Sequence, residues 1–374
     1  MVVSVWWNVP SSLFWCCRAG CELTLRELAR MAGMSKTAVC YALSGKGRVS
    51  EETRQRVTAL ADRFAYRPQA AGRALVTGRR EVIGLMSKQG FRYPWIASLQ
   101  AGVLEYVEQQ QQHVMLFRSE LNQARVPLVA LRRMVDGLIV VFGATPSFVA
   151  QLSHVGIPAT IAVPATAASL DLDCVRPDDT GGAAQATAHL IELGHRRIAF
   201  YQGDGNPIIE GVHLRRWQGY AHAMSRAGLP IYPGGDEMRT DPDKVLHALF
   251  FAPGCRMTGR RPPSALVCLS DSDAIGAMRW LRQHNLRVPQ DVSVIGFDDD
   301  PYGSYCVPTL STMSLHYDRI GAEAGRLLLA RIEHPELERQ EVVLPEELIA
   351  RESIAPPLEK SHAQSAVGRA EASS

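Results

Sequence analysis

The sequence predicts a small all-α head followed by a two-lobed α/β body with parallel sheets and helices on both faces. The chain of 374 residues is long for one domain, and its 46% hydrophobic content is typical of globular proteins. Residues 23–80 hold twelve Lys/Arg and four Asp/Glu, a net charge of +8, which leaves −6 for the residues after them. From Glu81 onward, apolar runs alternate with amphipathic stretches. A basic head on an acidic body indicates that only the head meets a polyanion.

Both ends of the chain are expected to lie outside the folded domains. Residues 1–22 lack the basic start and unbroken apolar stretch of a signal peptide, so we interpret them as a disordered extension or the product of an upstream start codon. Residues 356–374 are polar and predict a disordered tail. No apolar run reaches the roughly 18 residues of a membrane span. Scattered cysteines without a second ligand cluster predict neither a metal nor a cofactor.

Residues 23–66 predict three short helices. Thr24 and Glu27 form a capping box, apolar residues follow at helical spacing, and Gly33 ends this first helix. Ser35 caps the second helix and Ser50 begins the third. Two helices joined by a tight turn, the second with an exposed polar face, are typical of the helix-turn-helix.

Residues 67–80 predict a short hinge. Pro68 suits a first helical turn and Gly78 suits a helix end. A helix of this length is marginal alone in water, so we expect the hinge to fold when the protein binds its partner.

The body predicts parallel strands alternating with helices. The strand-like runs are Val82–Met86, Val114–Phe117, Gly137–Phe142, Ile157–Val163, Ile198–Tyr201, Ala265–Leu269 and Val292–Phe297. Amphipathic stretches lie between them at Ile96–Val107, Ala183–Leu193 and Asp271–Gln283. These strands are too many for one small sheet, which favours two α/β lobes with a cleft between them.

Several separate stretches match one family in order and spacing. They are Leu25–Ala29, Gly33–Val39, Val49–Arg54, Tyr66–Pro68, Val135–Ile139, His189–Ile198 and Asp291–Asp299. On these residues, the chain from Leu23 to about Ala355 resembles the lactose/galactose repressor (LacI/GalR) family of bacterial transcription regulators.

The resemblance implies a core similar to periplasmic sugar-binding proteins, with three chain crossings between its lobes. We place the crossings near Val175–Asp178, Met313–Tyr317 and Val343–Glu346. The expected division is a DNA-binding domain at 23–66, a hinge at 67–80 and an effector-binding and dimerisation domain at 81–355. In that domain, lobe 1 covers about 81–175 and 317–343, and lobe 2 about 178–313 and 346–355.

The resemblance also implies a function, that of a sequence-specific repressor of transcription in the bacterial cytoplasm, associated with the nucleoid. Its expected partners are near-palindromic operator DNA, a carbohydrate effector bound between the lobes, and a second copy in a homodimer or a tetramer. The alternative is a soluble sugar-binding or carbohydrate-active protein without a DNA role. That alternative needs an export signal or a catalytic constellation, and the sequence offers neither, so we expect no enzyme.

The DNA-binding residues are expected on the second helix and at two helix starts. The second helix presents Lys36, Thr37, Cys40 and Tyr41 to the major groove, unless these form only a solvated face. Ser35, Ser50 and Thr53 suit phosphate oxygens, although all three serve equally well as helix caps. In the hinge, the resemblance makes Gly72 part of the DNA contact and Leu75 a wedge between base steps; packing of Leu75 on the body is the alternative.

The effector residues are expected at the carboxyl ends of the body's strands. The resemblance makes Asp298 the carboxylate that accepts hydrogen bonds from the ligand and Arg216 its guanidinium partner. Ser270 and Asp271 follow a strand, and Trp95 falls where the family carries an aromatic that stacks on a ligand ring. Core packing for Trp95 and a helix cap for Asp271 remain equally open.

Three departures from the family pattern bear on specificity. Ala38 and Cys40 stand where Thr and Ser are common, and Gln69 and Gly72 stand where Asn and Ala are common. Glycine weakens a marginal helix by roughly 1 kcal/mol, which increases its dependence on DNA. The stretch 157–164 lacks the aspartate that often ends this strand, so the usual sugar is not assumed.

Overall fold

A computed structural model describes residues 23–44, 49–64, 66, 79–87, 93–118, 127–164, 171–203, 211–232, 241–251 and 261–358. The chain divides into two compact units, Met1–Arg80 and Glu81–Ser374, called here the head and the body. The N-terminal extension, most of the hinge with Gly72 and Leu75, and the tail from residue 359 lie outside the described residues. Within those residues, no helix is long and apolar enough to cross a membrane.

The head contains the three expected helices, α2 (Leu25–Ala32), α3 (Lys36–Ser44) and α4 (Glu51–Arg63). The capping box is confirmed: the backbone N–H of Thr24 donates to Glu27 (2.8 Å), and the N–H of Glu27 donates to the Thr24 hydroxyl (3.3 Å). Gly33 ends α2 in the left-handed conformation (φ 66°), which costs glycine little. The inward residues pack in one small apolar core: Leu28, Ala29, Val39, Ala42, Val57, Ala61 and Tyr66.

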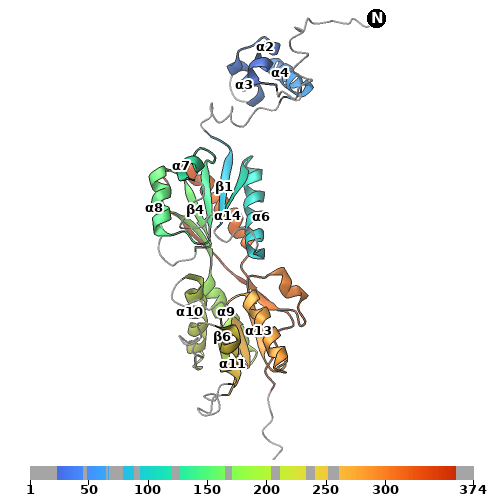
Figure 1. Ribbon diagram of the computed structural model, residues 1–374, viewed down its shortest axis with the longest axis vertical. Coiled ribbons are helices and arrows are strands. Elements are labelled where there is room, and N and C mark those ends of the chain that lie inside the picture. Colours follow the sequence, from blue (N-terminus) through green and yellow to red (C-terminus); the bar gives the residue numbers. More distant parts are fainter. Residues whose placement is uncertain are drawn as a thin grey trace, which may run out of the picture. The chain divides into compact units, whose positions relative to one another are not determined.

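Lobe 1 of the body is built on a parallel six-stranded sheet with the order β10-β5-β4-β3-β1-β2. Its strands are β1 (Val82–Ser87), β2 (His113–Arg118), β3 (Gly137–Val141), β4 (Ala159–Ala162), β5 (Asp173–Pro177) and β10 (Glu341–Leu344). Its helices are α6 (Pro94–Gln109), α7 (Leu128–Leu131), α8 (Pro146–Val155) and α14 (Tyr317–Glu333) (Figure 1).

Lobe 2 is built on a five-stranded sheet with the order β11-β9-β8-β7-β6, in which only the edge strand β11 runs antiparallel. Its strands are β6 (Ile198–Tyr201), β7 (Ala265–Cys268), β8 (Ser293–Phe297), β9 (Ser311–Ser314) and β11 (Glu347–Ile349). Its helices are α9 (Asp179–Glu192), α10 (Gly211–Arg226), α11 (Pro242–Phe251), α13 (Asp271–Gln283) and the 3₁₀ helix η2 (Pro301–Tyr305). The predicted fold class is confirmed.

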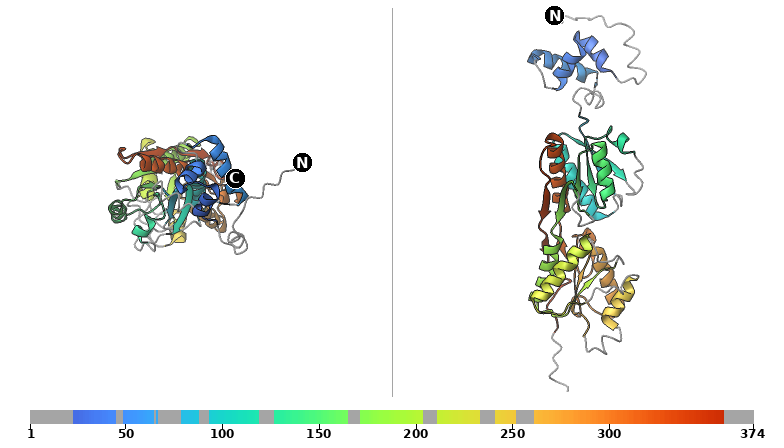
Figure 2. Two further views of the ribbon diagram at one scale, coloured as in Figure 1. Left: turned by 90° about the horizontal axis from the view of Figure 1, so that it is seen from above. Right: turned by 90° about the vertical axis from the view of Figure 1, so that its left-hand side faces the viewer.

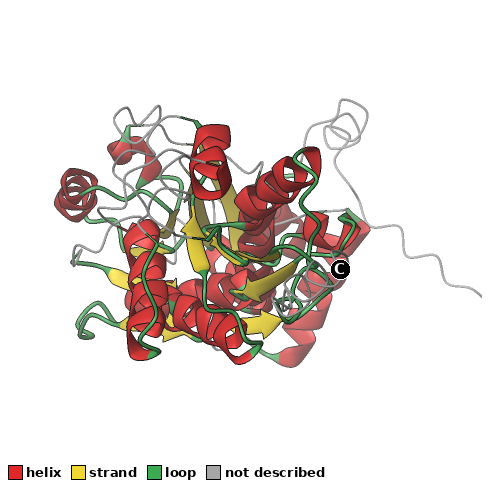
Figure 3. Cartoon of the chain, turned by 90° about the horizontal axis from the view of Figure 1, so that it is seen from below, coloured by secondary structure: helices red, strands yellow, loops and turns green. Residues whose placement is uncertain are grey.

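Helices cover both faces of each sheet because both faces of the strands are apolar (Figures 2 and 3). In lobe 1, Leu138 and Val140 of β3 face α7 and α8, whereas Ile139 and Val141 face α6 and α14. Lobe 2 repeats the alternation with α11 and α13 on one face and α9 and α10 on the other. The helices α6 and α14 approach closely, since a Cβ at Gly102 would lie 1.8 Å from the carbonyl oxygen of Asp318.

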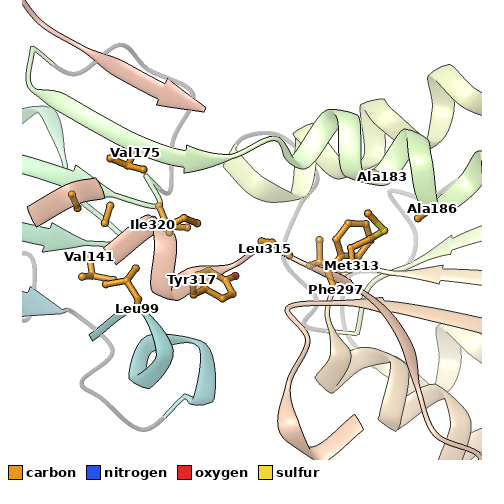
Figure 4. Packing of buried hydrophobic residues seen from close by; sticks show 14 of the residues in the cluster. Leu99, Val141, Val175, Ala183, Ala186, Phe297, Met313, Leu315, Tyr317 and Ile320 are labelled. Atoms are coloured by element: carbon orange, nitrogen blue, oxygen red, sulfur yellow. The ribbon is translucent and has the colours of Figure 1, made fainter. Parts of the chain in front are cut away.

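The chain passes between the two sheets three times: between β5 and α9, between β9 and α14, and between β10 and β11. At the second passage, Leu315 is fully buried on the connecting segment. Figure 4 shows it between Tyr317 on the side of lobe 1 and Phe297 and Met313 on the side of lobe 2. Apolar packing is therefore continuous from one lobe to the other around this segment.

Candidate functional site

The helix α3 exposes a mixed polar and aromatic surface on the head. Lys36 and Thr37 are exposed, the Tyr41 side chain is 43% exposed, and Cys40 is half-buried. Val39 and Ala42 on the opposite side of α3 are buried in the head core. The four side chains expected to reach DNA therefore lie together on the outer side of one helix.

Ser35 and Ser50 act as helix caps. The Ser35 hydroxyl accepts a hydrogen bond from the N–H of Ala38 (3.2 Å), and the Ser50 hydroxyl accepts one from the N–H of Thr53 (3.3 Å). The Thr53 hydroxyl lies 2.7 Å from that of Ser50. Both serines remain exposed, so capping leaves their outer surfaces open to a phosphate.

In the body, Arg216 is a buried cation with several polar partners. It lies on α10, is 3% exposed, and donates from Nε to Oδ1 of Asp179 (3.0 Å) and from Nη1 to the carbonyl oxygen of Leu269. Its Nη2 lies 3.5 Å from Oδ1 of Asp298, and its guanidinium carbon lies 4.4 Å from the centre of the Phe297 ring. The arginine is thereby fixed beside Asp298 in one orientation.

Asp298 directly follows β8 and has a strained backbone, with φ 107°. Its N–H donates to the carbonyl oxygen of Met313 (3.0 Å), and its Oδ1 accepts from the Tyr317 hydroxyl (2.9 Å). Burial raises the pKa of the Asp298 carboxyl to about 6, although Arg216 and Tyr317 favour the charged form. Strain, burial and a perturbed pKa coincide at this residue, a combination common in ligand sites.

Trp95 joins the same group of side chains from lobe 1. Its ring lies on α6 and contacts the Phe142 ring edge-on (6.2 Å between centroids) and the Tyr317 ring (5.1 Å). Trp95 is partly buried at the border of the large apolar core, so packing accounts for one side of the ring. Trp95, Tyr317, Asp298 and Arg216 form one continuous set of contacts, called here the interlobe cluster.

Ser270 and Asp271 have local partners. Ser270 is the cap of α13, where its hydroxyl accepts from the N–H of Asp273 (3.1 Å). Asp271 is 1% exposed and accepts hydrogen bonds from the Thr312 hydroxyl and the N–H of Asp300, both at 2.7 Å. Burial raises the pKa of Asp271 well above its usual range. The hydrogen bonds of Asp271 stabilise the strained turn after β8, which contains Asp298.

Sequence reasoning missed two residues that hold the cluster. Asp179 is fully buried and accepts from Nε of both Arg215 (2.9 Å) and Arg216 (3.0 Å). Tyr317 was expected at a crossing but not as a contact of Asp298. In both cases the signal was a polar side chain at a crossing between the lobes, namely an acidic pair after β5 and a tyrosine at the start of α14.

Two parts of the chain match known protein families. Residues 24–69 match the family described as "Bacterial regulatory proteins, lacI family", and residues 187–354 match "Periplasmic binding protein-like domain". The ribose operon repressor of Escherichia coli K12 is 30% identical over 335 residues, which cover 88% of this chain and 99% of that protein. The HTH-type transcriptional regulator CelR of Thermobifida fusca is 30% identical over 339 residues, covering 88% and 98%.

Solved structures have the same fold. A complex of the transcriptional regulator CelR with cellobiose is 25% identical, has a TM-score of 0.62, and matches 89% of this chain and 100% of that chain. A LacI family regulator from Enterococcus faecium with bound ribose is 25% identical, has a TM-score of 0.60, and matches 74% and 99%. The operator-bound lac repressor dimer, at 21% identity and a TM-score of 0.72 over 89% and 99%, supports the fold.

Proposed function

Because the chain belongs to the lacI family of bacterial regulatory proteins, we propose that it represses transcription by binding operator DNA through its head and a sugar through its body. The proposed division is a DNA-binding domain at 23–66, a hinge at 67–80, and a body at 81–355 for effector binding and dimerisation. The relatives are transcriptional regulators, so we propose no catalytic activity. A repressor acts where its operator is, so we propose that the protein works in the cytoplasm, associated with the nucleoid.

We assign operator recognition to α3. Lys36 suits the acceptor groups of guanine in the major groove, and Thr37, Cys40 and Tyr41 are next to it on the outer side of the helix. The charge of +8 over residues 23–80 supplies the phosphate contacts that dominate affinity.

In the hinge, we propose that Leu75 inserts between base steps in the minor groove and that Gly72 lies at the same contact. Leu75→Ala is expected to reduce DNA bending and affinity for the operator, whereas nonspecific binding by the head persists. Bending measured by energy transfer between dyes at the two ends of the duplex tests this; unchanged bending excludes the wedge.

The interlobe cluster is the proposed effector site, and one observation carries this assignment. Tyr317, at the start of α14 on lobe 1, hydrogen-bonds to Asp298 of lobe 2 beside the buried Arg216. A carboxylate and a guanidinium bind sugar hydroxyls, and the neighbouring Trp95 ring offers an apolar face to a sugar ring. The cellobiose-bound CelR and the ribose-bound regulator favour a sugar.

The cluster also suggests how a sugar alters DNA binding. Its residues come from both lobes, so a ligand that contacts them binds one arrangement of the lobes better than another. The sugar then changes the free energy of operator binding. By thermodynamic linkage, the operator changes the free energy of sugar binding by the same amount.

We propose a homodimer, with a tetramer as its further assembly. The segment from η2 onward exposes large side chains that a monomer leaves in water, Tyr302 (63%), Tyr305 (79%) and Val307 (90%). A second copy is the expected occupant, because near-palindromic operators require two heads. Val307→Asp is expected to give a monomer in analytical ultracentrifugation at micromolar concentration. An unchanged dimer places the interface elsewhere.

Thermal unfolding in the presence of ribose, cellobiose and a panel of other sugars tests the proposed effector site. A ligand at 100 times its dissociation constant adds about 2.7 kcal/mol of stability. Stabilisation of the native protein that disappears in Asp298→Asn supports the assignment. Stabilisation that persists in this variant contradicts the proposed site, and the absence of any stabilising sugar contradicts the proposed effector class.

A further inference from the structure

Glu346 is a half-buried acidic residue, and the fold does not explain why its carboxylate group is buried. It lies on the third passage between the lobes, where the chain leaves β10 and enters β11. Both of its carboxylate oxygens are buried, and neither has a hydrogen-bond partner. Buried polar groups in folded proteins are nearly always hydrogen-bonded, because an unpaired one costs free energy. A carboxyl group left in this state points to a partner that is absent from the isolated chain.

The Glu346 carboxyl lies against the first turn of α9. A Cβ at Gly182 would come within 1.8 Å of Oε2, so the glycine leaves the space that the carboxyl occupies. Burial raises the pKa of Glu346 well above its usual range; Arg216 opposes this shift, and Asp179 and Asp298 add to it. Burial therefore favours the protonated form of the carboxyl group, which can both donate and accept a hydrogen bond.

A second unpaired group belongs to the same set of residues. Arg215 donates from Nε to Asp179, but its Nη2 is buried without a partner. The residues around Asp179 therefore include two groups without a hydrogen-bond partner, the Nη2 donor of Arg215 and the carboxyl group of Glu346. Sugar hydroxyls both donate and accept, so one ligand is able to satisfy groups of both kinds.

The charges around Glu346 disfavour an anion. Two guanidinium groups, of Arg215 and Arg216, are both engaged by Asp179. Four carboxyl groups share this region: those of Asp178, Asp179, Asp298 and Glu346. A carboxylate or phosphate brought next to Glu346 would meet the neighbouring carboxylates of Asp179 and Asp298 in a poorly solvated place, whereas a hydroxyl or ammonium group would find acceptors there.

We propose that Glu346 is a specificity-determining residue of the effector site, which selects a ligand with a hydroxyl or ammonium donor and rejects one with a carboxylate or phosphate at that position. This inference rests on the proposed effector function. It adds a residue that comes from the passage between the lobes, where a bound ligand contacts both of them.

The experiment compares neutral sugars, amino sugars, sugar acids and sugar phosphates of matched ring size by titration calorimetry with the full chain. Binding is expected from neutral or amino sugars. Glu346→Leu is expected to weaken the best binder by about tenfold or more, the loss that corresponds to one buried hydrogen bond. Glu346→Gln keeps a hydrogen-bond donor and an acceptor but has no negative charge. This variant should therefore keep its affinity for a neutral sugar and lose its affinity for an amino sugar. Glu347→Gln, at the exposed neighbouring glutamate, is the matched control.

Thermal unfolding without ligand separates this role from a structural one. An unpaired buried carboxyl stabilises nothing, so Glu346→Leu should melt at the same temperature as the native protein or higher. A lower melting temperature would mean that Glu346 stabilises the fold, and would overturn the proposal. Preferential binding of a sugar acid or phosphate, or equal affinity in Glu346→Leu, would overturn it as well while leaving the sugar-sensing function intact. Failure of every sugar to bind would overturn both.

Discussion

The hydroxyl of Tyr317 donates a 2.9 Å hydrogen bond to Oδ1 of Asp298, and this contact connects the two lobes of the body. Tyr317 begins α14, which packs on the sheet of lobe 1, and Asp298 follows a strand of lobe 2. The same oxygen lies 3.5 Å from the buried Arg216. A ligand at this carboxylate would therefore alter a contact that holds the lobes in their present arrangement.

Tyr317→Phe tests this contact. The variant keeps the ring beside Trp95 and removes the donor, so the free energy of unfolding should fall by about 1 kcal/mol. It should also change the ratio of operator affinities with and without sugar. Urea denaturation and operator titration measure the two effects. Tyr93→Phe, at an exposed tyrosine outside the proposed dimer interface, is the control. If the Tyr317 variant matches this control in both measurements, the contact contributes neither to stability nor to coupling.

Asp298 predicts a pH dependence of stability. Its pKa of about 6 in the folded state exceeds the usual 3.8, so the native protein holds more protons than the unfolded chain between these values. Stability should therefore fall as the pH rises from about 4 to 6, by at most about 3 kcal/mol from this group.

Asp298→Asn removes this titration. Arg216, Tyr317 and Asp179 still face the site, and Asp271 and Glu346, whose raised pKa values partly reflect the Asp298 charge, also titrate. The informative quantity is therefore the difference between native and variant proteins. Denaturant unfolding from pH 4 to 7 should give curves of stability against pH that diverge between pH 4 and 6. Parallel curves would show that burial does not raise this pKa.

Asp179→Asn should be the most damaging single change in the cluster. Asp179 is fully buried and pairs with two arginines, and the neutral amide would deprive both of their nearest carboxylate. The expected loss of stability is about 3–5 kcal/mol. Asp291→Asn breaks an exposed pair with Arg287 and should cost less than about 1 kcal/mol. Similar denaturation midpoints for the two variants would contradict the structural role of Asp179.

The fold was predictable because its signals are local. The strand Ile198–Tyr201 and the helix Asp271–Gln283 have the predicted bounds, since apolar runs and helical periodicity need only neighbouring residues. The cap at Thr24 and the end at Gly33 were predictable for the same reason. The edge strand β11 was not predictable, because three residues are too few to show the alternation of polar and apolar side chains that marks a strand.

The site was less predictable because its contacts are distant in sequence. Arg216 and Asp298 were expected from the resemblance, but their respective partners, Asp179 and Tyr317, come from distant parts of the chain. Ser270 and Asp271 follow a strand, as ligand residues do, yet short-range capping and the turn at 298–300 occupy them. No sequence pattern indicates that the carboxylate oxygens of Glu346 are buried, because the residues on either side of it are exposed.

Lys36→Ala tests operator recognition by α3. A base contact predicts a loss of about 1–3 kcal/mol in operator affinity and weaker discrimination between sequences. Native affinity should also fall on the order of 10³-fold or more between 50 and 200 mM salt, because the head neutralises several phosphates. Lys244→Ala, at a 78% exposed lysine of the body, should leave both unchanged. Equal operator affinities for the two variants would contradict recognition through Lys36.

The central claim is that the interlobe cluster couples a sugar to DNA binding. Fluorescence anisotropy with a near-palindromic operator selected from random duplexes gives operator affinity with and without the sugar found in the thermal screen. For the native protein and the Asp291→Asn control, the sugar should change this affinity by about 5- to 150-fold. For Asp298→Asn, which keeps the acceptor for Tyr317 but loses the charge beside Arg216, the ratio should fall to near one. A ratio in Asp298→Asn equal to that of the native protein, at the same sugar concentration, would contradict the claim.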